Sequence, residues 1–226
     1  QINNIEGNQG DGSVTIQKLV MMEVINENGT IYNNIISAND YSISLYNTKS
    51  NIITNNDLSA NNYGINIINS DNNAFNTNNI TTANSYLIND ETNSTKNNFL
   101  SYYNQFGGIS WLGNVNLTIE ENGTLAVGIN PIFENYSVYF NSSKFQALNT
   151  GDVLLNIANT DDLMIEPEDK VIYIDGVLCS DCDIWNPYDY FVFTTSNLDG
   201  YEYKVGQVLL SCNTEINESI TLNNDI

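Results

Sequence analysis

Apolar side chains between Thr30 and Asn97 recur at a fixed interval. Residues 30–51 and 52–73 are both 22 residues long, and the following segment, 74–97, is 24 residues long. A position that stays apolar in successive copies is expected where each copy is one layer and its neighbours bury the inward side chains. Three such columns are Ile31, Ile53 and Phe75; Ile36, Leu58 and Ile80; and Ile43, Ile65 and Leu87.

Each copy is predicted to be a coil of short β-strands. Ile43 and Leu45 alternate with polar neighbours, which is the period of a strand with one buried face. Ile31 and Ile36 are five residues apart, so the chain must turn between them for both to face inward. A column of asparagines occupies this turn. Asparagine tolerates the left-handed conformation of a sharp corner and can form amide ladders. The column is Asn34, Asn56 and Asn78.

The run NIITNNDLSANNYGINIINSDNN at residues 51–73 carries a resemblance to a known family. It resembles the right-handed parallel β-helix proteins with short asparagine-rich repeats, such as NosD-like proteins and archaeal adhesin-like or S-layer-like surface proteins. The resemblance covers residues 30–106 and implies a parallel β-helix. Since the family includes binding modules, lyases and structural surface proteins, it does not imply one activity. The third copy departs from the pattern, because Asn89 takes the column of Leu45 and Ile67, which predicts a bulge at residues 89–93.

Outside the repeat, the pattern predicts further β-structure. Residues 1–12 look like a polar arm, and Val14–Ile25 an irregular first coil or cap. An aromatic run at 99–112 would plug the lower end of the coils, and the pair Gly107-Gly108 marks a predicted domain boundary. Eight short strands separated by turn signals then indicate an antiparallel sandwich. They are predicted at 115–119, 124–129, 137–140, 153–157, 170–174, 190–194, 202–210 and 219–222, with turns at Asn122-Gly123, Asp175-Gly176 and Asp199-Gly200.

The predicted fold is therefore all-β. A short right-handed parallel β-helix with its N-terminal arm or cap occupies residues 1–110, and an antiparallel β-sandwich occupies residues 111–226.

The net charge of the chain limits the kinds of partner that it can bind. The chain of 226 residues has a net charge of −21, with six lysines, no arginine and no histidine, and 42 asparagines. Phosphate binding needs a cationic surface, so no nucleic-acid partner is expected. No run of 18 apolar residues occurs, so no membrane insertion is expected either.

Three cysteines limit the chemistry. Cys179 and Cys182 have the spacing of a metal knuckle or redox motif, but a structural zinc site needs four ligands and only Cys212 remains. We expect a disulfide from Cys212 to Cys179 or Cys182. The third cysteine would then form an intermolecular bridge or be a buried free thiol.

Two acidic segments are candidate calcium sites, because calcium takes six to eight oxygen ligands. The alternative is a solvated acidic surface that keeps the protein soluble. Structural calcium is the only cofactor that the sequence indicates. The first segment holds Asp175, Asp181, Asp183 and Asp189, and the second holds Asp161, Asp162, Glu166, Glu168 and Asp169.

No enzymatic activity is expected. The acids of the repeat occupy different columns, so no facing carboxylate pair forms. No nucleophile motif is present, and the chain has no histidine or arginine to stabilise a developing charge. An outward aromatic stripe is formed by Tyr41, Tyr63 and Tyr86, and it would bind sugar rings or simply stabilise a β-surface.

Eight glycosylation sequons begin at Asn28, Asn79, Asn93, Asn116, Asn122, Asn135, Asn141 and Asn217.

Taken together, these features favour an extracellular structural protein of a microbial, and by resemblance archaeal, cell surface: a self-assembling subunit of a filament, surface layer or adhesin. Its main partner would be copies of itself, joined head to tail or by strand donation. The alternative is a carbohydrate-binding adhesion module for surface glycans, and after it a fragment of a polysaccharide lyase or hydrolase.

Overall fold

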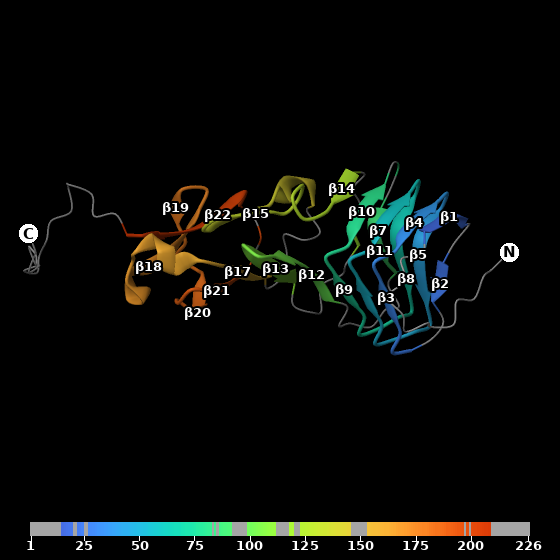
Figure 1. Ribbon diagram of the computed structural model, residues 1–226, viewed down its shortest axis with the longest axis horizontal. Coiled ribbons are helices and arrows are strands. Elements are labelled where there is room, and N and C mark those ends of the chain that lie inside the picture. The colour runs from blue at the N-terminus through green and yellow to red at the C-terminus, as the bar shows by residue number, and fades with distance from the viewer. Residues whose placement is uncertain are drawn as a thin grey trace, which may run out of the picture.

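The protein is described here by a computed structural model, which describes residues 15–19, 22–24, 27–82, 84, 86–91, 99–111, 118–119, 123–145, 153–196, 198 and 200–208. These residues form β-strands in four sheets and three short 3-10 turns, with no α-helix among them. The prediction of an all-β protein is confirmed. Three sheets meet around the repeat at one end of the long axis, and one of these three continues to the other end, where the fourth sheet lies (Figure 1).

Strands of the repeat stack in parallel on three faces, and we call the described part of residues 15–91 the coil stack. The first face is a five-stranded sheet of β1 (Thr15–Leu19), β4 (Ile35–Ala38), β7 (Asp57–Ala60), β10 (Asn79–Thr82) and β14 (Gly123–Leu125). The second is a four-stranded sheet of β2 (Met22–Val24), β5 (Tyr41–Tyr46), β8 (Tyr63–Ile68) and β11 (Tyr86–Asp90). The third begins with β3 (Thr30–Tyr32), β6 (Ile52–Thr54) and β9 (Ala74–Asn76). As expected for an irregular first coil, β1 and β2 pair in parallel with β4 and β5.

Two of the three predicted columns are confirmed by strand register. Ile31 pairs with Ile53 and Ile53 with Phe75 on the third face. Ile36, Leu58 and Ile80 are aligned in the same way on the first face, and all three are fully buried. Neighbouring coils therefore share one apolar interior.

The third column is wrong in its last member. Ile43 pairs with Ile65 as predicted, but Ile65 pairs with Ile88 rather than with Leu87. The step between β8 and β11 is thus 23 residues, because one extra residue is inserted after β10. Gly64 fits this shift, since a Cβ there would lie 2.6 Å from the carbonyl oxygen of Leu87. Asn89 consequently aligns with Asn66, to which it donates a hydrogen bond of 2.7 Å, instead of with Ile67.

The asparagine column forms a ladder at one corner of the coils. The side-chain oxygen of Asn56 accepts hydrogen bonds from the backbone and side-chain amides of Asn34, at 3.0 and 3.1 Å, and Asn78 accepts the same pair from Asn56 at 3.1 and 3.0 Å. The left-handed conformation expected of these residues lies one position earlier. It is adopted by Asn33, Asn55 and Thr77.

A second ladder, which the sequence analysis missed, stabilises another corner. The Asn51 side-chain oxygen accepts from the backbone N–H of Gly29 at 2.8 Å, and that of Asn73 accepts from the backbone N–H of Asn51 at 3.0 Å. Asn51 and Asn73 are buried, and a left-handed residue again precedes each. At both of these corners a left-handed residue is followed by an inward asparagine side chain that bonds to the neighbouring coil.

The third face continues beyond the repeat as one eight-stranded sheet. After β9 it contains β12 (Phe99–Asn104), β13 (Gly107–Trp111), β17 (Val153–Ile157), β21 (Phe191–Thr195) and β20 (Asp183–Asn186). Pairing is parallel as far as β12 and antiparallel from β12 onward. Gly107 and Gly108 lie inside β13, so the boundary predicted at residue 110 falls within a strand that joins the two parts of the chain.

A five-stranded antiparallel sheet completes the second half of the molecule, by which we mean residues 107–208. It consists of β15 (Ile132–Glu134), β16 (Ser137–Tyr139), β22 (Glu202–Gln207), β18 (Lys170–Ile174) and β19 (Val177–Leu178). We call the eight-stranded sheet the long sheet. Its Phe193 contacts Tyr203 of the five-stranded sheet, with ring centroids 6.5 Å apart. The 3-10 turns are η1 (Ser142–Lys144), η3 (Thr160–Leu163) and η4 (Pro167–Asp169).

Strand predictions for the second half are confirmed at 137–140, 153–157, 170–174, 190–194 and 202–210, within a few residues at each end. The Asp175-Gly176 turn is also confirmed, with both residues at positive φ. The predicted strand at 124–129 is shorter, and β15, β19 and β20 were not predicted. The segment 219–222 lies outside the described residues, as does most of 115–119.

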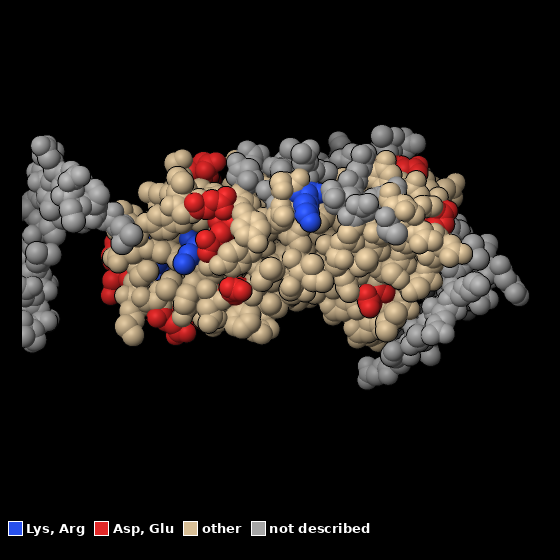
Figure 2. Space-filling view, turned by 90° about the horizontal axis from the view of Figure 1, so that it is seen from above, with Lys and Arg blue, Asp and Glu red and all other residues tan. Residues whose placement is uncertain are grey.

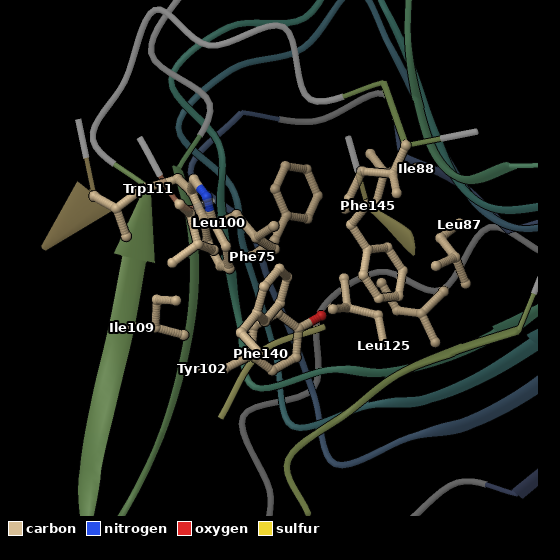
Figure 3. Close-up of a cluster of buried hydrophobic side chains, with 14 of the residues drawn as sticks. Phe75, Leu87, Ile88, Leu100, Tyr102, Ile109, Trp111, Leu125, Phe140 and Phe145 are labelled. Carbon is tan, nitrogen blue, oxygen red and sulfur yellow. The ribbon is translucent and has the colours of Figure 1, made fainter. Parts of the chain in front are cut away.

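Aromatic and aliphatic side chains close the lower end of the coil stack, as expected of the run at 99–112. The core at this end combines side chains from the coils, from β12 and β13 and from later segments (Figure 3). They are Phe75, Leu87 and Ile88 from the coils, Leu100 and Tyr102 from β12, Ile109 and Trp111 from β13, and Leu125, Phe140 and Phe145 from further along the chain. Trp111 and Phe140 have ring centroids 5.5 Å apart. One continuous hydrophobic core therefore extends across both parts of the chain.

Replacing Leu58 by Asp should prevent folding, because it places an unpaired charge in the centre of the coil stack. The matched control is Ile52→Asp, in a strand of the same coil, where the side chain is 44% exposed rather than fully buried. Circular dichroism and urea unfolding distinguish the two. A folded, equally stable Leu58→Asp protein would contradict the register.

Replacing Tyr102 by Phe should stabilise the protein by about 1 kcal/mol, since an unbonded buried hydroxyl costs free energy. Tyr102 is fully buried, its hydroxyl has no hydrogen-bond partner among the described residues, and burial raises its pKa well above the ordinary value. Urea unfolding monitored by circular dichroism measures the change. Destabilisation would show that the hydroxyl does form a bond in the intact chain.

Candidate functional site

The predicted calcium ligands do not converge on one point. The Asp175 carboxylate accepts hydrogen bonds from the backbone N–H groups of Tyr201, at 3.0 Å, and Glu202, at 2.8 Å, and so connects the β18–β19 turn to β22. Asp183 begins β20, and Asp189 lies in the loop before β21. Among the described residues, no three carboxylates lie close enough together to share a metal ion, and calcium in the first segment stays a prediction.

The cysteine prediction is wrong in its pairing. Cys179 and Cys182 are bonded to each other, with an S–S distance of 2.04 Å, so neither is available to Cys212, which lies outside the described residues. The reason is local: the chain turns between β19 and β20 and brings the two Cα atoms to 5.8 Å. Asp181 lies beside these sulfur atoms. Because both sulfurs are used in the disulfide, this cluster is not a metal site.

The second acidic segment contains an ion pair. The Lys170 side chain is completely buried, and its ammonium lies 2.8 Å from the Asp161 carboxylate and 3.2 Å from the Thr160 hydroxyl. Thr160 is also buried and donates its hydroxyl to the carbonyl oxygen of Tyr188 at 2.7 Å. Its backbone N–H donates to the carbonyl of Asp189 at 3.1 Å. This network attaches the loop before β21 to the core.

That loop carries aromatic side chains that the sequence analysis did not single out. Trp185, at the end of β20, is 73% exposed, and Tyr188 and Tyr190, between β20 and β21, are 62% and 56% exposed. The Trp185 indole N–H donates to the Thr194 hydroxyl at 3.2 Å, and the Asn186 side chain accepts from the backbone N–H of Tyr188 at 3.1 Å. The signal in the sequence was the density of aromatics in WNPYDY at 185–190. We call residues 185–190 the aromatic loop.

The tyrosine stripe on the coil stack exists as predicted, but its rings face one another. Tyr63 stacks on Tyr41 at 4.9 Å and on Tyr86 at 5.4 Å, with nearly parallel planes. All three are half-buried, and burial together with the nearby Asp40 carboxylate raises the pKa of Tyr41. A sugar ring stacks on the face of an aromatic ring. Because both faces of Tyr63 are occupied, the stripe serves coil packing better than sugar binding.

A pocket of about 270 Å³ opens beside η1 in the second half of the molecule. Asn141, Lys144, Tyr139 and Tyr201 are among the residues that line it. The Tyr139 hydroxyl donates to the Glu202 carboxylate at 3.0 Å, and this hydrogen bond raises the pKa of Tyr139. Lys144 gives the pocket a cationic rim in an otherwise acidic chain.

Four of the eight sequon asparagines are described. Asn28 and Asn135 are exposed, and Asn135 lies in the turn between β15 and β16, where an attached glycan would meet no strand. Asn79 lies within β10 and its side-chain amide donates to Asp57 at 2.9 Å. Asn141 is half-buried and accepts from the Ser143 hydroxyl at 2.7 Å. Asn93, Asn116, Asn122 and Asn217 lie outside the described residues.

No protein-family profile, curated protein or solved structure matches the chain. Within the part of the chain that the structure describes, no helix is long and apolar enough to cross a membrane.

Replacing Thr160 by Val should loosen the aromatic loop, because the Tyr188 carbonyl and the Lys170 ammonium both lose a buried partner, at a cost of about 1–3 kcal/mol. Hydrogen exchange should become faster at residues 188–191, while the amides of β12 and β13 keep their protection. Equal acceleration in both places, or none, would show that Thr160 does not anchor the loop.

Proposed function

We propose that this chain is an extracellular structural protein of a microbial, archaeal-type cell surface, which assembles with copies of itself into a filament, surface layer or adhesin. The observation that carries the proposal is the difference between the two ends of the coil stack. One end is closed by the chain itself, and at the other end β3 is the outermost described strand of the eight-stranded sheet.

At the closed end, each face of the coil stack is covered. On the first face β14 pairs with β10, and on the second the backbone of Ile119 exchanges hydrogen bonds with Leu87 and Ile88. On the third, β12 and β13 extend the sheet. No coil of a second copy can add there without displacing these segments.

At the other end, β3 is the outermost described strand of the eight-stranded sheet. Its inner side bonds to β6, since Gly29 accepts from the N–H of Ile52 at 2.9 Å and Asn33 donates to the carbonyl of Thr54 at 3.3 Å. Backbone groups alternate in direction along a parallel strand, so the N–H of Thr30 faces away from β6. An edge of this kind is a template for a strand from another molecule.

If β3 pairs with a different surface of the next copy, the assembly is open. A heterologous interface repeats without closing unless its rotation forms a ring, and so generates a fibre. The charge of −21 opposes contact between copies, and salt screens such repulsion. Assembly should therefore be favoured by higher ionic strength, as at a saline cell surface.

The parallel coils and the polar ladders also support the finer family assignment as part of the proposal. Residues 30–106 would belong with the right-handed parallel β-helix repeat proteins, and residues 111–226 would form an antiparallel β-sandwich. The exposed sequons at Asn28 and Asn135 are the positions where surface glycans would be attached.

Replacing Thr30 by Pro tests the proposal, because proline removes the outward N–H and leaves the bonds between β3 and β6 in place. The control, Thr30→Val, keeps the N–H. At 0.5 M salt the unaltered protein and Thr30→Val should form polymers in negative-stain images and light scattering, and Thr30→Pro should remain a monomer. A monomeric unaltered protein under these conditions would contradict assembly, and a polymerising Thr30→Pro protein would contradict the role of β3.

A further inference from the structure

We propose that the aromatic loop is a binding site for a neutral glycan. This goes beyond assembly, because the loop begins in the last two residues of β20, at the end of the long sheet opposite to β3 (Figure 1).

The first argument is exposure. Trp185, Tyr188 and Tyr190 are more than half exposed within six residues of chain, whereas the other tryptophan of the protein, Trp111, is 1% exposed. Large aromatic side chains are normally buried because they carry much apolar area. An exposed group of them rimmed by polar residues marks an interaction site.

The second argument is that the loop is held in place. The bond from its indole N–H to Thr194 orients the Trp185 ring, and the side chain stays 73% exposed. Tyr188 and Asp189 are fixed through their carbonyl groups by the buried Thr160, which the buried Lys170 supports in turn. A binding surface that is already ordered loses less conformational entropy when a ligand arrives.

The third argument concerns the edge of the sheet. Pairing between β20 and β21 shifts register between Ile184 and Asn186, so Trp185 lies at an irregularity of the edge strand. Such irregularities end strand pairing and redirect side chains, often beside functional sites. The edge at β20 is therefore suited to displaying Trp185 rather than to continuing the sheet into a second copy.

Charge selects the class of ligand. Asp181 and Asp183 precede the loop and Asp189 lies within it. Of the two lysines nearest in the sequence, Lys170 is buried and paired with Asp161, and Lys204 is exposed on β22 of the other sheet. One face of the molecule in Figure 2 likewise carries acidic side chains along much of its length and few lysines. Carboxylates accept hydrogen bonds from sugar hydroxyls but repel uronic or sialic acids. The aromatic faces meanwhile accept the apolar face of a hexose.

Tryptophan emission tests the site in the Thr30→Pro background, where failure of the assembly proposal does not affect the result. Because Trp111 is buried, a ligand-dependent change in emission or in acrylamide quenching reports on Trp185. The probes are neutral hexose and N-acetylhexosamine oligosaccharides and size-matched uronic-acid oligosaccharides. Neutral oligosaccharides should shift the emission to shorter wavelength and protect it from quenching, and the acidic ones should do neither.

Variants measured by calorimetry complete the test. Trp185→Ala should weaken binding of the same oligosaccharide by about tenfold or more, since it removes the stacking surface. Tyr103→Ala is the control, because Tyr103 is 53% exposed on β12 and outside the loop. The proposal is overturned if no neutral oligosaccharide alters the emission, if acidic ones bind equally well, or if Trp185 becomes protected on raising the protein concentration alone, which would assign the loop to a second copy.

Discussion

The structure depends on hydrogen bonds between one coil and the next. A corner of the chain leaves backbone N–H groups that no strand within the same coil can pair, and burying such a group without a partner costs free energy. Asn56 and Asn78 remove this cost for the coil above them, and Asn51 and Asn73 do so at another corner. Each bond requires the next coil to be present and in register. Apolar columns such as Ile36, Leu58 and Ile80 then fill the space that the corners enclose.

The need to pair backbone groups also explains the structure of the chain where the repeat ends. A stack of parallel coils ends in three exposed rows of backbone groups, which can pair with strands of other molecules. In a strongly acidic chain, charge repulsion between copies is the main electrostatic barrier to such pairing. Here the lower rows are covered by β14, Ile119 and β12. The third row is covered by the hairpin of β12 and β13, and strand pairing changes there from parallel to antiparallel. The next strand of the sheet, β17, belongs to the second half of the molecule and pairs with β13.

The sequence predicted the parts that repeat, because a column of like residues identifies its own register. It failed where the step changes. Leu87 and Ile88 are both apolar, so a one-residue insertion between them and Ile80 left no mark in the hydrophobic pattern, and only the backbone pairing with Ile65 distinguishes them. The disulfide was mispredicted because connectivity does not follow from spacing. The aromatic loop was missed because exposure is a tertiary property: Trp111 and Trp185 look alike in the sequence, and one is buried while the other is not.

The order of strands in the long sheet has a mechanical consequence. The sheet runs from β3 to β20 along the length of the molecule, so its strands lie across that axis and its hydrogen bonds lie along it (Figure 1). Tension between the two ends of such a sheet loads its hydrogen bonds in sequence, one strand pair at a time, rather than shearing many at once. A molecule built in this way yields to a pull in small steps, coil by coil, and each released coil lengthens the chain by about 22 residues, or roughly 70 Å of extended backbone. At the cell surface proposed above, such a protein would act as an extensible tether that absorbs force instead of transmitting it.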